Sequence, residues 1–358
     1  MTDAAPTLLL RPVRSDDLDD LYALSLSTGG GLTTLPPDRD VLARKIAASE
    51  QSFAGGSDIP QEPYFLFAAE DIASRRVVGT SGIFAAVGLR LPFYSYRLLK
   101  LTQVAAEPAF KVDTQLLQLV NDFAGATELG TLFLHPDWRS GGNGALLSKA
   151  RYLMMAAFPD RFADKVMAEI RGWVDATGAS PFWEAVGRHF FAMDFAEADR
   201  INGMGNQQFI ADLMPKFPIY ANLLPQSARD VIGRPHDKAR GAVRLLEDEG
   251  FRFAGAVDIF DGGPCYEAPR GAIRSLRAAR RLTARIGAPD PETAIDCMVG
   301  NLHAGDMRIL RTPISGDLTG AAVIDETAAG ALDIEDGAAV IAAPLNARDL
   351  SIWLTDRI

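Results

Sequence analysis

The stretch Glu128–Leu147, ELGTLFLHPDWRSGGNGALL, decides the fold. A short apolar run at Leu129–Leu134 has the length of a buried strand, and the apolar positions of Ala145–Phe158 recur at helical spacing. Between them, His135–Gly144 is rich in glycine and polar residues, which is typical of a loop. The stretch therefore predicts a strand, a glycine loop and a helix in direct succession.

The glycine loop is a candidate anion site, because Arg139, Gly142 and Gly144 have the spacing R-x-x-G-x-G. Glycines let the backbone approach an anion closely, and N–H groups at the start of a helix point outward at the positive end of its dipole. A pyrophosphate fits such a loop, and Arg139 adds a positive charge. The spacing also fits mononucleotide and dinucleotide sites, and by itself it slightly favours a tight turn that caps the helix without a phosphate.

The segments that precede the loop argue against a dinucleotide site. Leu8–Val13 reads as a buried strand followed by a helix, and a second helical pattern covers Pro37–Phe53. Tyr64–Glu70 and Val77–Val87 are strand-like runs joined by a polar turn, so they predict an antiparallel hairpin. A dinucleotide loop would instead follow the first strand of a parallel β-α-β array.

The pattern of Leu91–Phe123 assigns no element and is interpreted as an insertion of mixed character. The further predictions are a strand at Asp164–Val174, a helix at Ser180–Met193, a short element at Phe209–Met214, a helix at Ala239–Glu249, a strand at Phe251–Phe260 and a basic helix at Arg270–Arg285. Asp296–Leu354 alternates short apolar runs with Gly, Asp and Asn, which predicts a small β-rich unit.

Composition excludes several classes of protein. With 358 residues and 48% hydrophobic content, the chain can bury more than one core. A formal net charge of −10 leaves no excess of Lys and Arg for nucleic-acid phosphates, so no nucleic-acid partner is expected. Cys265 and Cys297 form no CxxC pair, which disfavours a disulfide framework. Met1–Leu10 has neither a basic region nor an apolar run long enough for export or membrane insertion, so we expect a cytoplasmic protein.

The strand and loop resemble the acetyl-CoA motif of GNAT acyltransferases. The pattern L-x-L-x-P-x-x-R-x-x-G-x-G-x-x-L is met by Leu132, Leu134, Pro136, Arg139, Gly142, Gly144 and Leu147. The resemblance implies that the strand splays from its neighbour and receives the pantetheine of an acyl-CoA. Acyl-CoA is then a co-substrate, and no resident cofactor is expected.

A more specific resemblance, to the arginine N-succinyltransferases of bacterial arginine catabolism, covers most of the chain. The matching segments, in order, are RPV (11–13), SLSTGGGLTTLP (25–36), ELGTLFLHPDWRSGGNGALLSKAR (128–151), SPFW (180–183), DLMPKFPIY (212–220), DVIGRPH (230–236) and GFRFAGAVDIFDGGP (250–264). The tail after about Arg285 matches least. The resemblance implies transfer of succinyl from succinyl-CoA to the α-amine of L-arginine.

The resemblance also implies residue roles. The residue matching Leu132 belongs to the succinyl-CoA site, and the histidine of D-V-I-G-x-x-H, His236, is the proton donor. Read without the family, His236 is a loop residue that caps a helix or faces water. An imidazole changes protonation near neutral pH, which suits donation to the departing CoA sulfur. The predicted acyl-CoA-binding set is Leu132, Leu134, Arg139, Ser140, Gly142 and Gly144.

Other polar residues have weaker support as site residues. His135 and His189 are expected to be structural, and His303 has no motif support. No pair of histidines has metal-ligand spacing, so no metal is predicted. The carboxylates near the turn D-I-F-D-G-G-P could meet a guanidinium in bidentate fashion, although turn formation is the favoured interpretation. They are Asp258, Asp261 and Glu267.

The predicted architecture is α+β: a GNAT-like acyl-CoA-binding core (1–205), a second GNAT-like α/β portion carrying His236 (206–285) and a small β-rich tail (286–358). A homo-oligomer is expected, with pairing to a paralogous subunit as an alternative. Two other functions stay open. One is succinyl transfer to ornithine or another basic amino acid, and the other is a non-catalytic acyl-CoA-binding subunit.

Overall fold

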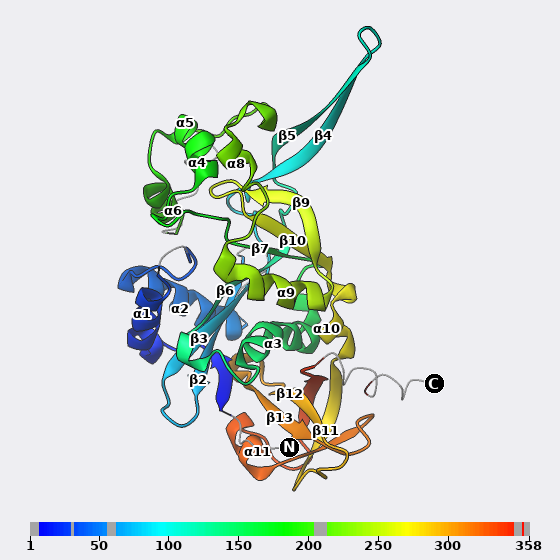
Figure 1. The fold of residues 1–358 in the computed structure, drawn as a ribbon. Helices are drawn as coiled ribbons and strands as arrows, with labels where there is room; N and C mark the ends of the chain where they lie inside the picture. The colour runs from blue at the N-terminus through cyan, green and yellow to red at the C-terminus, as the bar shows by residue number, and fades with distance from the viewer. Residues whose placement is uncertain (1–6, 30–31, 56–61, 204–212, 347–352, 354–358) are drawn as a thin grey trace.

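The computed structural model describes residues 7–29, 32–55, 62–203, 213–346 and 353. Within these residues the chain has the predicted α+β class, and its strands form one 15-stranded mixed sheet. The strand order is β14-β11-β15-β12-β13-β1-β2-β3-β6-β7-β10-β9-β4-β5-β8. Figure 1 shows that the sheet runs the length of the molecule, with α1 and α2 on one flank and α3, α9 and α10 on another.

The strands are β1 (Leu8–Pro12), β2 (Tyr64–Asp71), β3 (Val77–Phe84), β4 (Ser95–Ala105), β5 (Phe110–Val120), β6 (Thr127–Leu134), β7 (Lys165–Glu169), β8 (Ile219–Tyr220), β9 (Arg252–Asp258), β10 (Pro264–Pro269), β11 (Arg280–Ile286), β12 (Ile295–Asn301), β13 (Ile309–Ile314), β14 (Ala321–Ile324) and β15 (Ala339–Pro344). The α-helices are α1 (Leu18–Ser27), α2 (Arg39–Phe53), α3 (Asn143–Ala157), α4 (Pro181–Ala185), α5 (Gly187–Phe191), α6 (Phe195–Gly203), α8 (Gln226–Arg229), α9 (Arg240–Glu249), α10 (Arg274–Ala278) and α11 (Glu326–Leu332).

The predicted strand, loop and helix are confirmed as β6, the glycine loop and α3. Strand β6 bulges where its residues Thr131 and Leu132 both lie opposite Ser81 of β3. Thr131 has a positive φ of 51°, and its carbonyl accepts a 2.9 Å hydrogen bond from the Thr80 hydroxyl. The bulge therefore changes the direction of β6 immediately before the loop.

The predicted antiparallel hairpin is confirmed as β2 and β3, which pair from Tyr64 with Phe84 to Glu70 with Val77. One face of the hairpin packs on α1 and α2, in a cluster that includes Leu42 of α2. The other face packs on α3 through the main core. Alternation along the strands thus separates two apolar layers.

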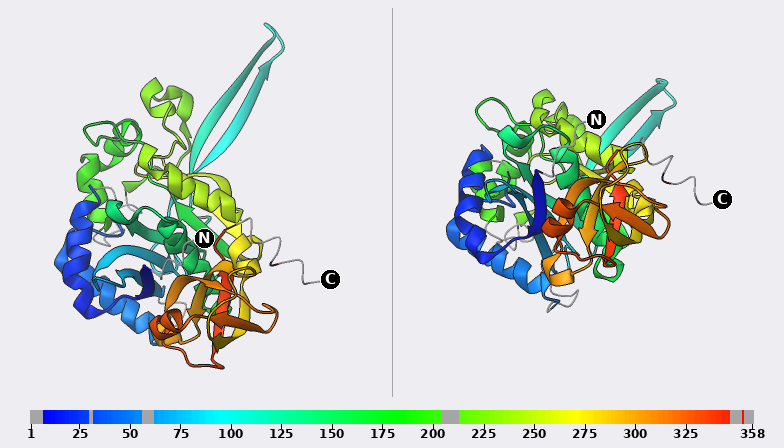
Figure 2. Two further views of the ribbon diagram at one scale, coloured as in Figure 1. Left: turned by 60° about the horizontal axis from the view of Figure 1, so that its bottom comes forward. Right: turned by 90° about the horizontal axis from the view of Figure 1, so that it is seen from below.

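The segment Leu91–Phe123, to which sequence assigns no element, forms the long hairpin β4–β5. The two strands pair along their full length, from Ser95 with Val120 to Ala105 with Phe110. Figures 1 and 2 show that the far end of this hairpin, called the arm below, projects away from the body. The arm does not alternate strictly between apolar and polar residues, and none of the core clusters in the described residues covers it.

Two predicted elements are wrong in type or extent. The basic helix predicted at Arg270–Arg285 is the short helix α10 followed by β11, since β11 pairs with β14 and β15 and this long-range pairing overrides the local helical pattern. The helix predicted at Ser180–Met193 is two short helices, interrupted at Val186 with φ −123° and ψ −75°. The strand predicted at Asp164–Val174 is β7 and ends at Glu169. Of the element predicted at Phe209–Met214, residues 209–212 lie outside the described residues. Gly30 and Gly31 of the matching segment 25–36 also lie outside them.

The C-terminal segment is β-rich, as predicted, and its strands continue the main sheet. Strand β13 pairs antiparallel with β1, with Leu9 opposite Leu310. A second core cluster joins Leu9 to the apolar residues of β11–β15 and α11. The domain limits 1–205, 206–285 and 286–358 remain predictions. The sheet and the main core cluster run across both boundaries.

Candidate active site

The glycine loop lies at the N-terminus of α3. Gly141 and Gly142 have φ of +61° and +86°, a region that favours glycine. The Asn143 N–H donates to the Ser140 carbonyl at 3.1 Å and closes the turn. Among the described hydrogen bonds, none uses the backbone N–H of Gly142 or Gly144, and the first turn of α3 has no acidic side chain. The loop therefore presents backbone donors at the positive end of the helix dipole.

Strands β6 and β7 are parallel and diverge towards their carboxyl ends. They pair only at Thr127 with Val166 and Glu128 with Met167. Beyond that point β6 pairs with β3 alone, and β7 pairs with β10. The opening between the two strands leads to the glycine loop at the end of β6. A ligand that spans this opening meets the loop with its anionic end.

The predicted acyl-CoA-binding residues lie at this end of β6, with different exposures. Leu132 is half-buried, whereas the Leu134 side chain is only 6% exposed and belongs to the main core. The carbonyl of Leu134 accepts a 2.8 Å hydrogen bond from Arg139 Nε, so this guanidinium folds back over β6. Ser140 is exposed, and a Cβ built on Gly144 would meet no atom within 4 Å. Any contact from Leu134 to a ligand would therefore come from its backbone.

Arg311 of β13 reaches the glycine loop from the C-terminal segment. Its Nη1 donates to the Gly141 carbonyl, and its Nε donates to Asp296 Oδ1 at 2.7 Å. A Cβ on Gly142 would lie 2.9 Å from the same guanidinium. Sequence reasoning missed this contact, because no local pattern links residues 170 positions apart. The C-terminal segment, whose sequence matches the family least, thus supports the glycine loop.

His236 lies at the carboxyl end of β7. Its N–H donates to the Arg171 carbonyl at 2.8 Å, and the preceding Pro235 forms a β-bridge with Gly172. Its ring Nδ1 accepts a 3.1 Å hydrogen bond from the Lys238 N–H, so the proton of the neutral ring is on Nε2. The structure thus places His236 and the glycine loop at the same edge of the sheet, after adjacent parallel strands.

The surroundings of His236 favour its neutral form. Burial lowers the pKa of the ring from its ordinary 6.5, and the positive charge of Arg171 lowers it further. Asp261 is nearby and acts in the opposite direction, but both of its oxygens accept backbone hydrogen bonds, from Gly172 at 2.6 Å and Gly263 at 2.8 Å. A neutral ring with a fixed Nε2–H can donate a hydrogen bond to a developing anion.

Comparison with known proteins decides the family. The model of the family described as "Arginine N-succinyltransferase beta subunit" matches residues 8–275. The chain is 44% identical over 341 residues to arginine N-succinyltransferase subunit beta of Pseudomonas aeruginosa, covering 95% of this chain and 99% of that protein. It is 45% identical over 303 residues to arginine N-succinyltransferase of Enterobacter sp. (strain 638), covering 85% and 88%.

The chain belongs to the arginine N-succinyltransferase family. A solved structure of arginine/ornithine succinyltransferase subunit AI from Pseudomonas aeruginosa matches with a TM-score of 0.86 at 33% identity, covering 96% of this chain and 100% of that one. The family is one of GNAT-type acyltransferases, so the predicted family and fold are confirmed. The match of whole chains includes the β-rich tail.

In this member of the arginine N-succinyltransferase family, sequence reasoning missed two glutamates at the diverging strands. Glu128 of β6 and Glu169 of β7 are half-buried, and burial raises the pKa of both carboxyls, that of Glu128 to about 7. Neither takes part in an ion pair within the described residues. Each of the two strands carries only one acidic residue, which is also typical of a solvated position, so the local sequence did not indicate a site.

The remaining candidates of the sequence analysis have other contacts in this family member. Asp258 Oδ1 accepts the N–H groups of Phe260 and Asp261 at 2.7 and 2.8 Å, so the turn-forming interpretation is confirmed there. His135 caps the 3₁₀ turn of the glycine loop, while His189 and His303 are exposed. In the described part of the chain, no cluster of three or more His, Cys, Asp or Glu is placed to hold a metal ion, and no helix is long and apolar enough to span a membrane.

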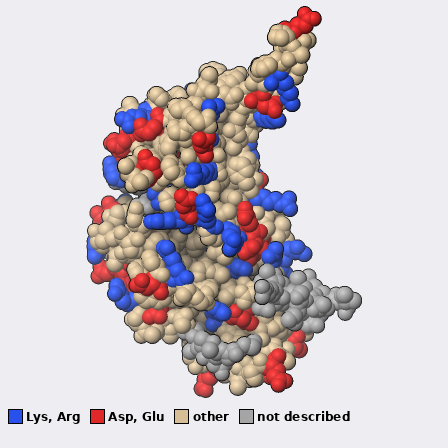
Figure 3. All heavy atoms as spheres, viewed as in Figure 1, with Lys and Arg blue, Asp and Glu red and all other residues tan. Residues whose placement is uncertain are grey.

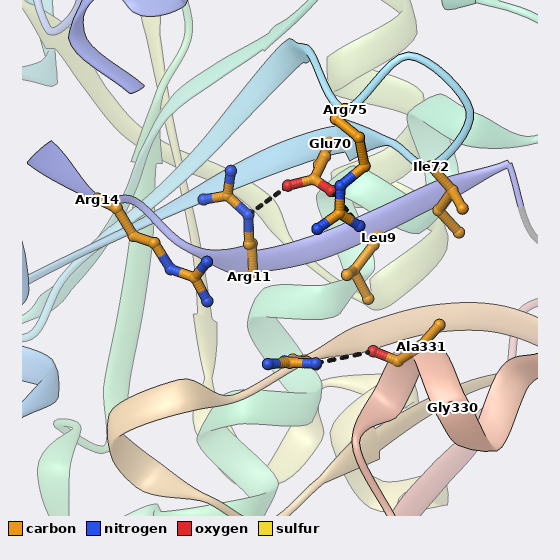
Figure 4. A pocket seen from close by; sticks show the side chains of 9 residues that line it. Leu9, Arg11, Arg14, Glu70, Ile72, Arg75, Gly330 and Ala331 are labelled. Atoms are coloured by element: carbon orange, nitrogen blue, oxygen red, sulfur yellow. Dashed lines mark hydrogen bonds and ion pairs between the residues drawn. The ribbon is translucent and has the colours of Figure 1, made fainter. Parts of the chain in front are cut away.

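A pocket of about 270 Å³ lies apart from these residues, between the N-terminal strand and the C-terminal segment (Figure 4). Its lining includes Arg11, Arg75 and Arg308. Arg11 pairs with Glu70 at 2.6 Å, and Arg75 pairs with the other oxygen of the same carboxylate at 2.9 Å. These cations are satisfied within the protein. The pocket contains neither His236 nor any glycine-loop residue, so it is not the candidate site.

Proposed function

We propose that the chain transfers the succinyl group of succinyl-CoA to the α-amine of L-arginine and releases CoA. The observation that carries this proposal is the divergence of parallel strands β6 and β7, with an anion-accepting loop at the end of one and His236 at the end of the other. Family membership supports the reaction type. The opening between the strands is the proposed place of the pantetheine and the thioester.

In the proposed mechanism the neutral α-amine attacks the thioester carbonyl, and the C–S bond then breaks. The Nε2–H of His236 donates to the departing sulfur, whose thiol pKa near 8.5 makes it a fair leaving group. The Nε2–H of the neutral ring stabilises the developing thiolate by a hydrogen bond, and the proton that the nitrogen loses on becoming an amide goes to the sulfur, which leaves as the CoA thiol. The products are N2-succinylarginine and CoA, without a covalent enzyme intermediate.

Two alternatives differ in acceptor or in activity. Succinyl transfer to ornithine is supported by the solved relative that is described as an arginine/ornithine succinyltransferase. A non-catalytic acyl-CoA-binding subunit is supported only by the word subunit in the names of relatives. This one chain contains both the glycine loop and a His236 that is held by hydrogen bonds, which favours the catalytic function.

An assay of the purified chain with succinyl-CoA and a panel of amino acids tests the proposal, with CoA thiol release as the readout. We expect arginine to have the highest kcat/KM. Equal turnover of ornithine would favour the broader acceptor range. Binding of succinyl-CoA without turnover of any amine would favour the non-catalytic subunit.

The remaining parts of the proposal concern the state of the protein. Succinyl-CoA is a co-substrate, and no resident cofactor or metal is required by the chemistry. We propose a cytoplasmic enzyme that self-associates, consistent with the subunit names of its relatives. Basic and acidic side chains are interspersed over the face seen in Figure 3, without a basic stripe for a nucleic acid.

A further inference from the structure

One face of the sheet carries a row of carboxylates beside the proposed site. Alternate residues of β6 and β7, including Leu129 and Val166, pack in the main core with α3, so Glu128 and Glu169 point to the opposite face. Glu169 pairs with Cys265 across β7 and β10, and Cys265 lies in the small cluster of that opposite face. Asp258 of the next strand, β9, completes the row. The row therefore crosses β6, β7 and β9.

The centre of the row, Glu169, has no positive partner among the residues that the structure describes. The one hydrogen bond of the Glu169 side chain in the described residues comes from the Cys265 thiol, at a long 3.8 Å. Lys45 is near Glu128, but its ammonium lies over the rings of Tyr64 and Phe84, at 5.4 and 5.9 Å from the centroids. Of the three carboxylates, only Glu128 thus has a neighbouring lysine among the described residues.

These carboxylates are half-buried. Glu128, Glu169 and Asp258 each keep part of their surface accessible. Burial nevertheless raises the pKa of Glu169 and Asp258 well above their ordinary values. Repulsion from Asp258 raises the pKa of Glu169 further, and repulsion from Asp261 raises that of Asp258. Uncompensated like charges in a partly enclosed place are typical of functional sites rather than of structural ion pairs.

An independent observation, the buried hydroxyl of Ser95, also indicates a ligand. Ser95 is 0% exposed, and its Oγ has no hydrogen-bond partner in the described residues. It pairs with Asp258 across β4 and β9, which puts both side chains on the same face of the sheet. A buried hydroxyl without a partner costs free energy, so a polar ligand group at this end of the row would stabilise it.

We propose that this row, centred on Glu169, binds the positively charged side chain of the acceptor amino acid. The inference rests on the proposed function and names the part of the site that selects the acceptor. Glu169 is two residues before Arg171, whose carbonyl anchors His236, so the bound cation lies next to the reacting edge. A planar guanidinium presents several N–H donors to adjacent carboxylates, which a neutral side chain of the same shape does not satisfy.

The Glu169→Gln variant tests the inference, because it removes the charge and keeps the shape. We expect its KM for arginine to rise by about ten- to a hundredfold, with an unchanged Kd for succinyl-CoA. The wild-type preference in kcat/KM for arginine over its neutral isostere citrulline should fall by a similar factor. Unfolding at pH 8 should occur at the wild-type temperature or above, because the variant lacks an uncompensated buried charge.

Glu184→Gln is the control, since Glu184 is an exposed glutamate of α4 that is paired with Arg188 at 2.9 Å. It should leave the KM for arginine and the preference over citrulline unchanged. If Glu169→Gln does not fold, Glu128→Gln and Ser95→Ala carry the same test, with a rise in the KM for arginine expected in each.

The outcomes separate the two proposals. A wild-type chain that does not succinylate arginine overturns the proposed function. An active wild type together with a folded Glu169→Gln that keeps both its KM for arginine and its preference over citrulline overturns the inference alone. A loss of kcat without any change in KM or preference would also overturn it, because the carboxylate would then act on the chemistry rather than on acceptor binding.

Discussion

His236 is held by its backbone and its ring together. The backbone N–H bonds to the strand extension after β7, and the ring accepts from Lys238 at the start of a 3₁₀ turn, Asp237–Ala239. These two contacts fix the direction of Nε2 without a carboxylate partner for the ring. The position is therefore suited to donating one hydrogen bond to a group that approaches from the opening between β6 and β7.

At this residue we predict that His236→Ala lowers kcat by about a hundred- to ten-thousandfold, which is the usual contribution of a positioned acid or base. Affinity for succinyl-CoA should hardly change, because the glycine loop is a separate part of the site. Since a protonated ring cannot accept from Lys238, wild-type kcat should also fall as the pH drops through the pKa of His236, below 6.5. Steady-state kinetics across pH at saturating substrates measures both effects.

Two results would contradict this role of His236. A variant with normal turnover and only a lower melting temperature would make His236 a structural loop residue. Retention of the acidic limb in the alanine variant would assign that limb to another group.

Gly142 is the second informative residue. We predict that Gly142→Ala weakens succinyl-CoA binding by about tenfold or more, because φ of +86° strains any L side chain and its Cβ meets Arg311 at 2.9 Å. Gly330→Ala is the control, since Gly330 lies in α11 outside the loop, its Cβ would meet nothing within 4 Å and its φ is not positive. Calorimetric titration of both variants measures the difference. Equal affinities in the two variants would show that the glycine loop is not part of the succinyl-CoA site.

At the scale of elements, α3 and β13 act on the loop from two sides. Helix α3 supplies the backbone donors, and Arg311 of β13 holds the Gly141 carbonyl. Asp296 of β12 orients that guanidinium in turn. The position of the loop thus depends on strands that lie more than 150 residues later in the chain.

We therefore predict that Arg311→Gln raises the Kd for succinyl-CoA by about three- to tenfold while kcat at saturation stays near the wild-type value. Loss of one charge-assisted hydrogen bond to a half-exposed loop is of this size. Arg285→Gln is the control, because Arg285 forms an exposed pair with Asp336 in the same C-terminal segment. An Arg311 variant with wild-type affinity would show that the loop keeps its shape without β13.

At the scale of the whole molecule, packing within the body does not account for the arm. In the described part of the chain, only its base has other strand neighbours, with β9 at Ser95–Arg97 and β8 at Leu116–Leu117. Further out, Leu99, Val104 and Phe110 are 42%, 75% and 63% exposed. An isolated two-stranded hairpin is marginally stable in water, so apolar residues on it favour contact with another chain.

We predict that replacing residues 101–114 with an Asn-Gly turn lowers the molar mass of the protein in solution, because the arm then no longer reaches a second copy. Light scattering after size exclusion measures the mass, and circular dichroism checks that the body stays folded. A wild-type chain that is already monomeric would contradict self-association. It would leave a paralogous subunit as the expected partner.

Local patterns in the sequence were sufficient for elements whose signals lie within a few residues. The glycine spacing of Arg139–Gly144 predicted the turn before α3, and two strand-like runs joined by a polar turn predicted the hairpin β2–β3. Ordered motif matches predicted the family and indicated His236 and the acyl-CoA-binding set, whose roles remain predictions. These signals are local because turn conformation, helix start and strand alternation depend on neighbouring residues.

Only the tertiary structure decided which distant segments meet. Strand β11 was mistaken for a helix because its pairing with β14 and β15 is absent from the local pattern. The contact of Arg311 with the glycine loop, and the row of Glu128, Glu169 and Asp258, join residues from separate strands. Each depends on strand order and register, which are set by packing across the whole sheet, so charge and spacing along the chain carried no sign of them.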